Sequence, residues 1–182
     1  MSEMMLRDAS AVSGLKHIIL RYFNVAGADP LGRTGQSTKN ATHLIKAAVE
    51  TAVGKRPKIE VYGTDYNTAD GTAVRDYIHV SDLVAAHFDA LRYLRSGGHS
   101  TTLNCGYARG HSVLDVIDTV KRVSGVDFAV TFGGRRAGDL PAIVADGGLI
   151  RSVLGWRPQF DNLDTIVRHA LAWERILPQR QV

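Results

Sequence analysis

Residues 17–27, His-Ile-Ile-Leu-Arg-Tyr-Phe-Asn-Val-Ala-Gly, join an apolar run of strand length to a polar turn. The branched and aromatic side chains of His17–Phe23 favour a buried strand, and the turn from Asn24 to Gly27 is predicted to end it. A second run of this kind, Thr101–Cys105, also ends in a glycine turn. Both segments are typical of parallel strands in an α/β fold, where ligands bind beyond the carboxyl ends of the strands.

Helices alternate with short strands along the rest of the chain, which indicates the α/β class. The expected helices cover residues 1–13 before Gly14, 42–53 before Gly54, the segment after an N-cap at Ser81, 113–124 after a capping box at Ser112 and Asp115, 149–154 and 163–177. The expected further strands cover residues 59–62, 74–80 and 128–132, the last with Phe128, Val130 and Phe132 on a buried face. The helix after Ser81 is expected to bury Leu83, Val84, His87, Phe88, Leu91 and Leu94.

Composition limits the class of protein. A length of 182 residues with 45% hydrophobic and 22% charged residues allows about one domain with a real core. No apolar run reaches the length needed to cross a membrane, and residues 1–10 lack the pattern of a secretory signal. The single Cys105 suits a reducing cytoplasm. A net charge of only +4 without a basic block does not indicate nucleic-acid binding, and leaves anionic small molecules open.

The number of parallel strands is low for an α/β fold. Only Ile18–Phe23 and Thr102–Cys105 have the character of buried parallel strands. Two such strands do not make a stable doubly wound sheet, because strand–helix units need several parallel neighbours. The strands are therefore expected either to pair outside this chain or to belong to a piece of a larger protein.

Motifs that would define a catalytic site by themselves are missing from the sequence. It has no Gly-x-Gly-x-x-Gly between a strand and a helix, no Walker loop, no His-Glu-x-x-His and no serine nucleophile elbow. Residues 65–71 are similar to a calcium loop, but the glycine falls at position seven rather than six and no closing Glu follows. No metal site is therefore expected.

Polar residues nevertheless gather near the predicted strand ends and loops. Asn24 follows a strand directly and is either a turn former or a ligand-binding amide. Arg75 lies beside Asp76, which favours either an internal ion pair or an anion contact. Arg136 and Asp139 lie in a glycine-containing loop, either as solvated charges or as part of a diphosphate clamp, since guanidinium groups match phosphate oxygens.

Taken together, the motifs resemble a known family. In chain order they are Arg21-Tyr-Phe-Asn24, Tyr62-Gly-Thr-Asp-Tyr-Asn-Thr-Ala-Asp-Gly-Thr72, Val74-Arg-Asp-Tyr-Ile-His-Val-Ser-Asp-Leu83, Arg135-Arg-Ala-Gly-Asp-Leu-Pro141 and Leu154-Gly-Trp156. The chain, over about residues 1–177, resembles the C-terminal half of the UDP-glucose 4-epimerases, which are extended short-chain dehydrogenases/reductases. The second motif narrows the resemblance from that superfamily to the epimerases.

The resemblance implies the fold and the site. It implies the C-terminal part of an NAD-binding Rossmann fold in residues 1–28 and 76–107, and a UDP-sugar-binding domain in residues 29–75 and 108–182. Tyr22 and Phe23 would lie beside the nicotinamide. The residues implied to contact UDP-glucose or UDP-galactose are Asn24, His43, Leu44, Tyr62, Arg75, Arg136, Asp139 and Ile143. The complete enzyme is expected to be a cytoplasmic isomerase and a homodimer, with no nucleic-acid or membrane partner.

The implied reaction is the inversion of C4 of a UDP-hexose, in which NAD takes a hydride from C4 and returns it to the other face. Two departures concern the substrate. Position 43 is His where several relatives carry Asn, and Ile143 is intermediate in size at the position that tunes tolerance of N-acetylated sugars.

A third departure concerns catalysis. None of the six tyrosines is followed four residues later by lysine, so the family's Tyr-x-x-x-Lys pair is missing, as is the glycine-rich NAD loop. The chain is expected to begin just downstream of the catalytic helix residues and to be inactive alone. The alternatives are another extended-family nucleotide-sugar enzyme, a dehydratase or decarboxylase, or a non-catalytic remnant that binds UDP-sugars.

Overall fold

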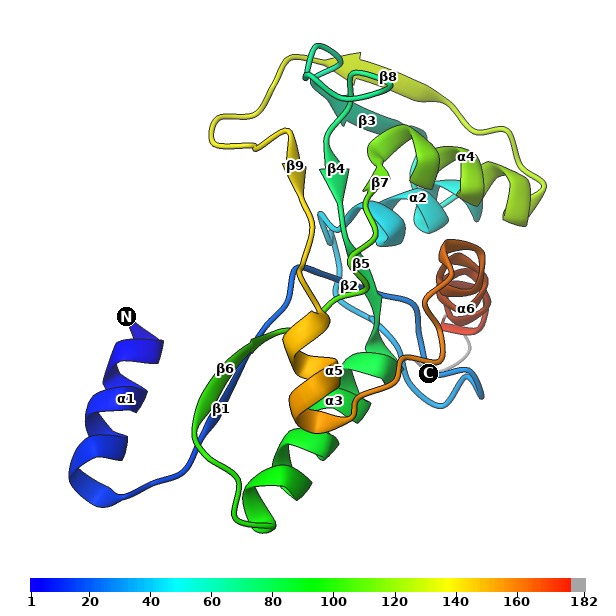
Figure 1. The fold of residues 1–182 in the computed structure, drawn as a ribbon. Helices are drawn as coiled ribbons and strands as arrows, with labels where there is room; N and C mark the ends of the chain where they lie inside the picture. The colour runs from blue at the N-terminus through cyan, green and yellow to red at the C-terminus, as the bar shows by residue number, and fades with distance from the viewer. Residues whose placement is uncertain (178–182) are drawn as a thin grey trace.

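The strands form small separate sheets rather than one continuous sheet (Figure 1). The computed structural model describes residues 1–177. In chain order its elements are α1 (Ser2–Ser13), β1 (Ile18–Arg21), β2 (Asn24–Ala26), α2 (Leu44–Ala52), β3 (Ile59–Tyr62), β4 (Val74–Arg75), β5 (Tyr77–His79), α3 (Val80–Arg95), β6 (Thr101–Asn104), β7 (His111–Ser112), α4 (Val113–Ser124), β8 (Val130–Gly133), β9 (Ala142–Ile143), α5 (Gly148–Leu154) and α6 (Leu163–Ile176). No helix within residues 1–177 is long and apolar enough to cross a membrane.

The two strands expected to be parallel do pair with each other. Strand β1 runs parallel to β6, with Ile18 opposite Thr101 and Arg21 opposite Asn104. The prediction that the extended segment stops at Asn24 is wrong. After two residues outside regular structure, the chain becomes extended again as β2 and pairs in parallel with β5. Only at Gly27, with φ of +80°, does the chain turn away.

Two further sheets, together with α2 and α4, form the upper part of the molecule in Figure 1, and α6 lies below α4. Strand β3 is parallel to β8, while β4 lies between antiparallel β7 and parallel β9. Helices α2, α4 and α6 pack against one another, and their buried apolar side chains share one core with those of α3 and β6. The expectation of only two parallel strands is therefore corrected: parallel pairs also occur at β2–β5, β3–β8 and β4–β9, although each is short.

Several helix ends are where the sequence predicts them. The capping box is confirmed: Asp115 N–H donates to Ser112 Oγ at 2.9 Å, and Ser112 N–H donates to the Asp115 carboxylate at 3.0 Å. Gly14 and Gly125 end α1 and α4 in the left-handed conformation. These signals are local, since each involves groups only a few residues apart.

Helix α3 contradicts the sequence prediction at two points. Its N-cap is His79 rather than Ser81, and the N–H of Ser81 donates to His79 Nδ1. Its buried face consists of Asp82, Leu83, Ala86 and Ala90, whereas Val84, Phe88 and Leu91 are 61%, 60% and 53% exposed. The small alanines let the helix approach the strands closely, so the large side chains lie on the opposite face. The predicted burial of Phe132 is also wrong, because this side chain is 61% exposed, whereas Phe128 is buried as predicted.

Helix α1 stands apart from the other helices (Figure 1). Among the described residues it buries none of its own side chains. The carboxylate of Glu3 receives two hydrogen bonds from the Arg21 guanidinium, at 2.7 and 2.5 Å. This exposed ion pair connects α1 to β1.

His79 connects three parts of the fold. Its Nδ1 accepts the Ser81 N–H at 3.0 Å, so the proton of the neutral ring must be on Nε2, which lies 3.0 Å from His169 Nδ1 on α6. The ring also stacks on Phe160, with 4.6 Å between the ring centroids. A Cβ on Gly27 would come within 2.7 Å of the ring, so only glycine fits there without a shift. His79 is completely buried.

This environment predicts a pH-dependent stability. Burial, together with the neighbouring His169, lowers the pKa of His79 to about 4, although the Asp82 and Asp29 carboxylates act in the opposite direction. The folded state therefore favours the neutral ring. The stability from this group is present above pH 6.5 and is lost as the pH falls towards 4. We expect a loss on the order of 3 kcal/mol over this interval, measured by urea unfolding at successive pH values.

His79→Asn is the matched control, because an amide oxygen also caps a helix but does not titrate. We expect this variant to be less stable at pH 8 and to show a shallower pH dependence between 6.5 and 4. Equal slopes for the two proteins would show that His79 is not the source.

Candidate functional site

Four of the predicted site residues form one cluster. Arg75 lies on β4, Tyr62 ends β3, and Arg136 and Asp139 lie in the loop between β8 and β9. The Asp139 carboxylate accepts from Arg136 Nε at 2.8 Å and lies 3.8 Å from Arg75 Nη2. Two guanidinium groups therefore approach one carboxylate from different segments of the chain. We refer to Tyr62, Arg75, Arg136 and Asp139 as the arginine cluster.

Backbone carbonyl groups fix Arg75. Its Nη1 donates to Val74 O and Leu140 O, both at 2.8 Å. The Arg75 side chain is half-buried, while that of Arg136 is exposed. The cluster therefore has one guanidinium held by backbone carbonyl groups and one more exposed guanidinium held by the Asp139 carboxylate.

The ring of Tyr62 completes the cluster. The Arg136 guanidinium carbon lies 5.1 Å from the centre of this ring, within the range of a cation–π contact. The Tyr62 hydroxyl donates to Glu60 at 3.1 Å, and this hydrogen bond raises the pKa of Tyr62. The phenol is thereby oriented and remains neutral, and its ring is partly exposed as a flat apolar surface.

The neighbouring Arg135 does not belong to the cluster. Its guanidinium donates to the Asp65 carboxylate at 2.7 Å and to Asp65 O, and lies over the ring of Tyr66. Although Arg135 is adjacent to Arg136 in sequence, it has a separate carboxylate partner. Asp65 belongs to the segment that resembled a calcium loop. Within residues 1–177 no group of three or more His, Cys, Asp or Glu is arranged to hold a metal ion.

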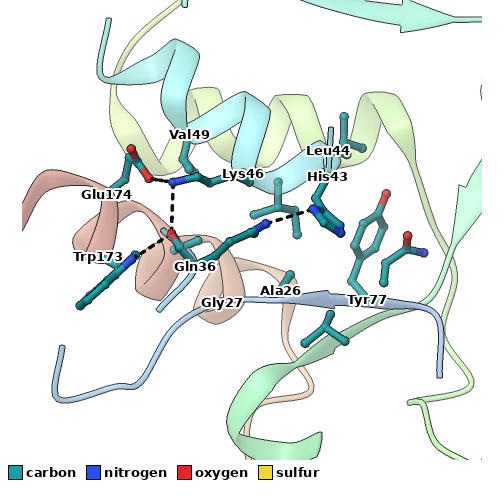
Figure 2. Close-up of a pocket in the computed structure, with 14 residues that line it drawn as sticks. Ala26, Gly27, Gln36, His43, Leu44, Lys46, Val49, Tyr77, Trp173 and Glu174 are labelled. Carbon is teal, nitrogen blue, oxygen red and sulfur yellow. Dashed lines mark hydrogen bonds and ion pairs between the residues drawn. The ribbon is translucent and has the colours of Figure 1, made fainter. Parts of the chain in front are cut away.

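A second group of predicted residues lines a narrow pocket (Figure 2). Asn24 comes from the start of β2, His43 is the N-cap of α2, and Leu44 is its first residue. Tyr77 of β5, directly opposite Asn24 in the parallel pair, also lines the pocket. A helix N-terminus presents N–H groups and a partial positive charge, so this wall of the pocket favours an anion or a hydroxyl group.

The opposite wall contains residues that the sequence did not single out. They are Gln36, Lys46, Trp173 and Glu174. Gln36 O accepts from Lys46 Nζ at 3.2 Å and from Trp173 Nε1 at 3.1 Å, and Lys46 is hydrogen-bonded to Glu174 (Figure 2). Gln36 and Trp173 are 137 positions apart in the sequence, and Lys46 and Glu174 are 128 positions apart. No local sequence pattern could therefore have identified these contacts.

Asp76 connects the two groups of site residues. It lies between Arg75 and Tyr77, and Asn24 Nδ2 donates to its carbonyl at 3.4 Å. Its buried carboxylate accepts N–H groups from Tyr107, Ala108 and Ala145. Burial raises the pKa of Asp76, against the effect of these N–H groups.

Arg75 and Asp76 do not form the internal ion pair that was one of the two interpretations of their adjacent positions. Arg75 has Asp139 as its carboxylate neighbour, while Asp76 binds backbone amides of two distant loops. Ile143 is paired with Arg75 in the register of β9 and β4. Ile143 therefore lies beside the arginine cluster.

Tyr22 and Phe23 lie at the carboxyl end of β1. They are 44% and 46% exposed, and the Tyr22 ring contacts His87 edge-on, with 6.3 Å between the centroids. Large aromatic side chains exposed at a strand end give a surface on which a flat ring can stack. Neither residue lines the pocket of Figure 2.

The motifs and this geometry agree with the comparisons with known proteins. The model of the NAD dependent epimerase/dehydratase family matches residues 1–106. The chain belongs to this family.

Relatives within the NAD dependent epimerase/dehydratase family match nearly the whole chain. A UDP-glucose 4-epimerase of Azospirillum brasilense is 59% identical over 179 residues, which are 98% of this chain and 51% of the relative. The crystal structure of the Brucella ovis UDP-glucose 4-epimerase in complex with NAD superposes with a TM-score of 0.90 at 42% identity, over 93% of this chain and 52% of that one. The Bifidobacterium longum enzyme in complex with NAD+ and UDP has a TM-score of 0.90 at 33% identity, over 97% and 52%.

The chain thus spans about half the length of the relatives it matches. The α/β class and the similarity to UDP-glucose 4-epimerases expected from the sequence are confirmed.

The loops whose N–H groups bind the Asp76 carboxylate provide a test of packing at the site. A Cβ on Gly106 would lie 2.5 Å from Ala145 Cβ and 2.7 Å from Asp76 Oδ2, and both of these neighbours are buried. We therefore expect Gly106→Ala to lower the free energy of unfolding by about 1–3 kcal/mol, measured by chemical denaturation. The control is Gly134→Ala in the loop before Arg135, where a Cβ would meet no atom of residues 1–177 within 4 Å. A change there of more than about 0.5 kcal/mol would contradict this explanation.

Proposed function

We propose that this chain binds the UDP portion of UDP-glucose and UDP-galactose as the substrate-binding part of a UDP-glucose 4-epimerase. The observation that carries the proposal is the arginine cluster: two guanidinium groups from separate segments, one carboxylate and one exposed aromatic ring. The Bifidobacterium longum relative, whose structure is a complex with NAD+ and UDP, supports it.

Each member of the arginine cluster suits one part of UDP. Guanidinium groups bind phosphate oxygens in pairs, so Arg75 and Arg136 would hold the diphosphate. The Tyr62 ring offers a face for the uracil, and the Asp139 carboxylate can accept ribose hydroxyl groups. Because Arg75 is fixed by two carbonyl groups, we expect it to orient the diphosphate, while the more exposed Arg136 closes onto it.

The pocket at α2 would receive the sugar end of the diphosphate. Asn24, His43 and the N-terminus of α2 at Leu44 provide donors for phosphate or hydroxyl oxygens. Ile143, in register with Arg75, would border the hexose and set the room available at its substituents. Firm binding of UDP with few contacts to the sugar would leave a keto-sugar free to turn, as inversion at C4 requires.

NAD is the cofactor that we propose for the complete enzyme, where it would take up and return the hydride of C4. Tyr22 and Phe23 fit one side of a nicotinamide, because both are about half exposed at the carboxyl end of a parallel strand. We assign no residue of this chain to proton removal from the 4-hydroxyl group, since none of its six tyrosines is followed by lysine at the fourth position. A cytoplasmic location fits the single, buried and unpaired Cys105.

The arginine cluster gives the first functional test. We expect the chain to bind UDP in isothermal titration calorimetry, and Arg75→Ala and Arg136→Ala each to weaken binding by about 10- to 100-fold. That range corresponds to the loss of one charge-assisted interaction.

Arg135→Ala is the matched control, because it removes the same charge one residue away, where the guanidinium is already held by Asp65. We expect at most about a threefold change from this variant. Equal losses for Arg135→Ala and Arg136→Ala would mean that net charge, rather than the cluster, determines the affinity.

The second test concerns turnover. We expect the purified 182-residue chain to convert no UDP-galactose to UDP-glucose above background with added NAD, because it lacks the Tyr-x-x-x-Lys pair. Product would be measured by a coupled UDP-glucose dehydrogenase assay, with a full-length relative as the positive control. Reproducible conversion by this chain would show that one of its own residues removes the proton.

A further inference from the structure

The side chain of Gln36 meets that of His43 at the mouth of the pocket in Figure 2. Gln36 Nε2 lies 3.0 Å from His43 Nδ1. An amide nitrogen donates hydrogen bonds and does not accept them, so His43 Nδ1 must be the acceptor. In the neutral imidazole the single proton is then on Nε2. With the amide in this orientation, the contact favours the Nε2–H tautomer of His43.

The backbone of Gln36 is held in place by two helices. Its carbonyl oxygen accepts from Lys46 Nζ of α2 and from Trp173 Nε1 of α6. The preceding residue, Gly35, lies so close under the Trp173 ring that a Cβ there would come within 2.5 Å of it. The Gln36 side chain therefore extends from a point held by two helices.

His43 is well placed to use the tautomer. It is the N-cap of α2 with extended backbone angles, yet its side chain caps no N–H group among the described residues. The imidazole is exposed and lines the pocket together with Asn24 and Leu44. A neutral imidazole without a partner exchanges its proton between Nδ1 and Nε2, and so presents a donor at Nε2 only part of the time.

We propose that Gln36 is a positioning residue that holds His43 as the Nε2–H tautomer, so that this N–H donates to a phosphate or hydroxyl oxygen of the bound UDP-sugar. The inference rests on the proposed function for the identity of the ligand. The tautomer itself can be measured without a ligand. Lys46 and Trp173 act one step further away, because they hold the backbone of Gln36.

The tautomer is tested without any ligand. The nitrogen chemical shifts of the His43 ring, measured by 15N NMR at pH 8.5 and assigned with a His43→Asn variant, distinguish the two neutral forms. We expect Nε2–H alone in the unmodified chain and a mixture in Gln36→Leu. Gln36→Glu, whose carboxylate only accepts, should move the proton to Nδ1. A mixture in the unmodified chain, or an unchanged Nε2–H form in Gln36→Glu, would overturn the proposal. Circular dichroism and the Tm of each variant confirm folding.

The consequence for binding is tested by a double-mutant cycle with UDP-glucose in calorimetry. We expect Gln36→Leu to weaken binding by about twofold when residue 43 is His, because a ring that is in the Nε2–H form about half of the time loses affinity by that factor. In the His43→Asn background the same change should leave binding unchanged, because a carboxamide has its own N–H donor. Equal losses in both backgrounds would mean that Gln36 acts only on the structure of the loop.

The two proposals fail in distinguishable ways. If the unmodified chain binds no UDP-glucose while the NMR shows the fixed Nε2–H form, the proposed function is wrong and the role of Gln36 in fixing the ring stands. If UDP-glucose binds and the NMR shows a mixture of tautomers, the proposed function stands and the role of Gln36 is wrong.

Discussion

The arrangement of the pocket depends on a buried ion pair between Lys46 of α2 and Glu174 of α6, which are only 6% and 1% exposed. Burial by itself would raise the pKa of Glu174, but the ammonium groups of Lys46 and Lys55 outweigh it and keep the pKa below its usual value. Removing one partner of such a pair typically costs about 3–5 kcal/mol, because the other charge is left buried and unpaired. The two helices are thereby tied together, and Lys46 also reaches the carbonyl of Gln36.

At both His79 and His43 a hydrogen bond at one ring nitrogen determines which nitrogen carries the proton. At His79 a backbone N–H, and at His43 an amide N–H, donates to Nδ1, and in each case the ring proton is left on Nε2. The outcomes differ because of burial. His79 uses its Nε2–H inside the fold, on His169, whereas the His43 ring is exposed and lines the pocket.

What the sequence predicted, and what it missed, follows from the distance along the chain between interacting groups. The helix end at Gly14 and the capping box at Ser112 were predictable, because their partners are within four residues. Which face of α3 is exposed was not predictable from the sequence. Apolar side chains lie on two faces of this helix, and packing against the strands buries the face that carries Ala86 and Ala90. For the site, the motifs named Arg75 and Arg136, which the structure brings to one carboxylate. Gln36 depends on partners as distant as Trp173 and carries no local signal.

The position of Asp139 between two arginines has a consequence for the thermodynamics of binding. A bare pair of guanidinium groups would attract a layer of mobile anions, and a ligand would gain entropy by releasing them. Here an internal carboxylate already neutralises one of the two positive charges, so fewer mobile anions remain to be released when a phosphate binds. The affinity of the cluster for an anion should therefore vary less with salt concentration than that of a bare arginine pair, and depend more on how well each oxygen fits the two guanidinium planes.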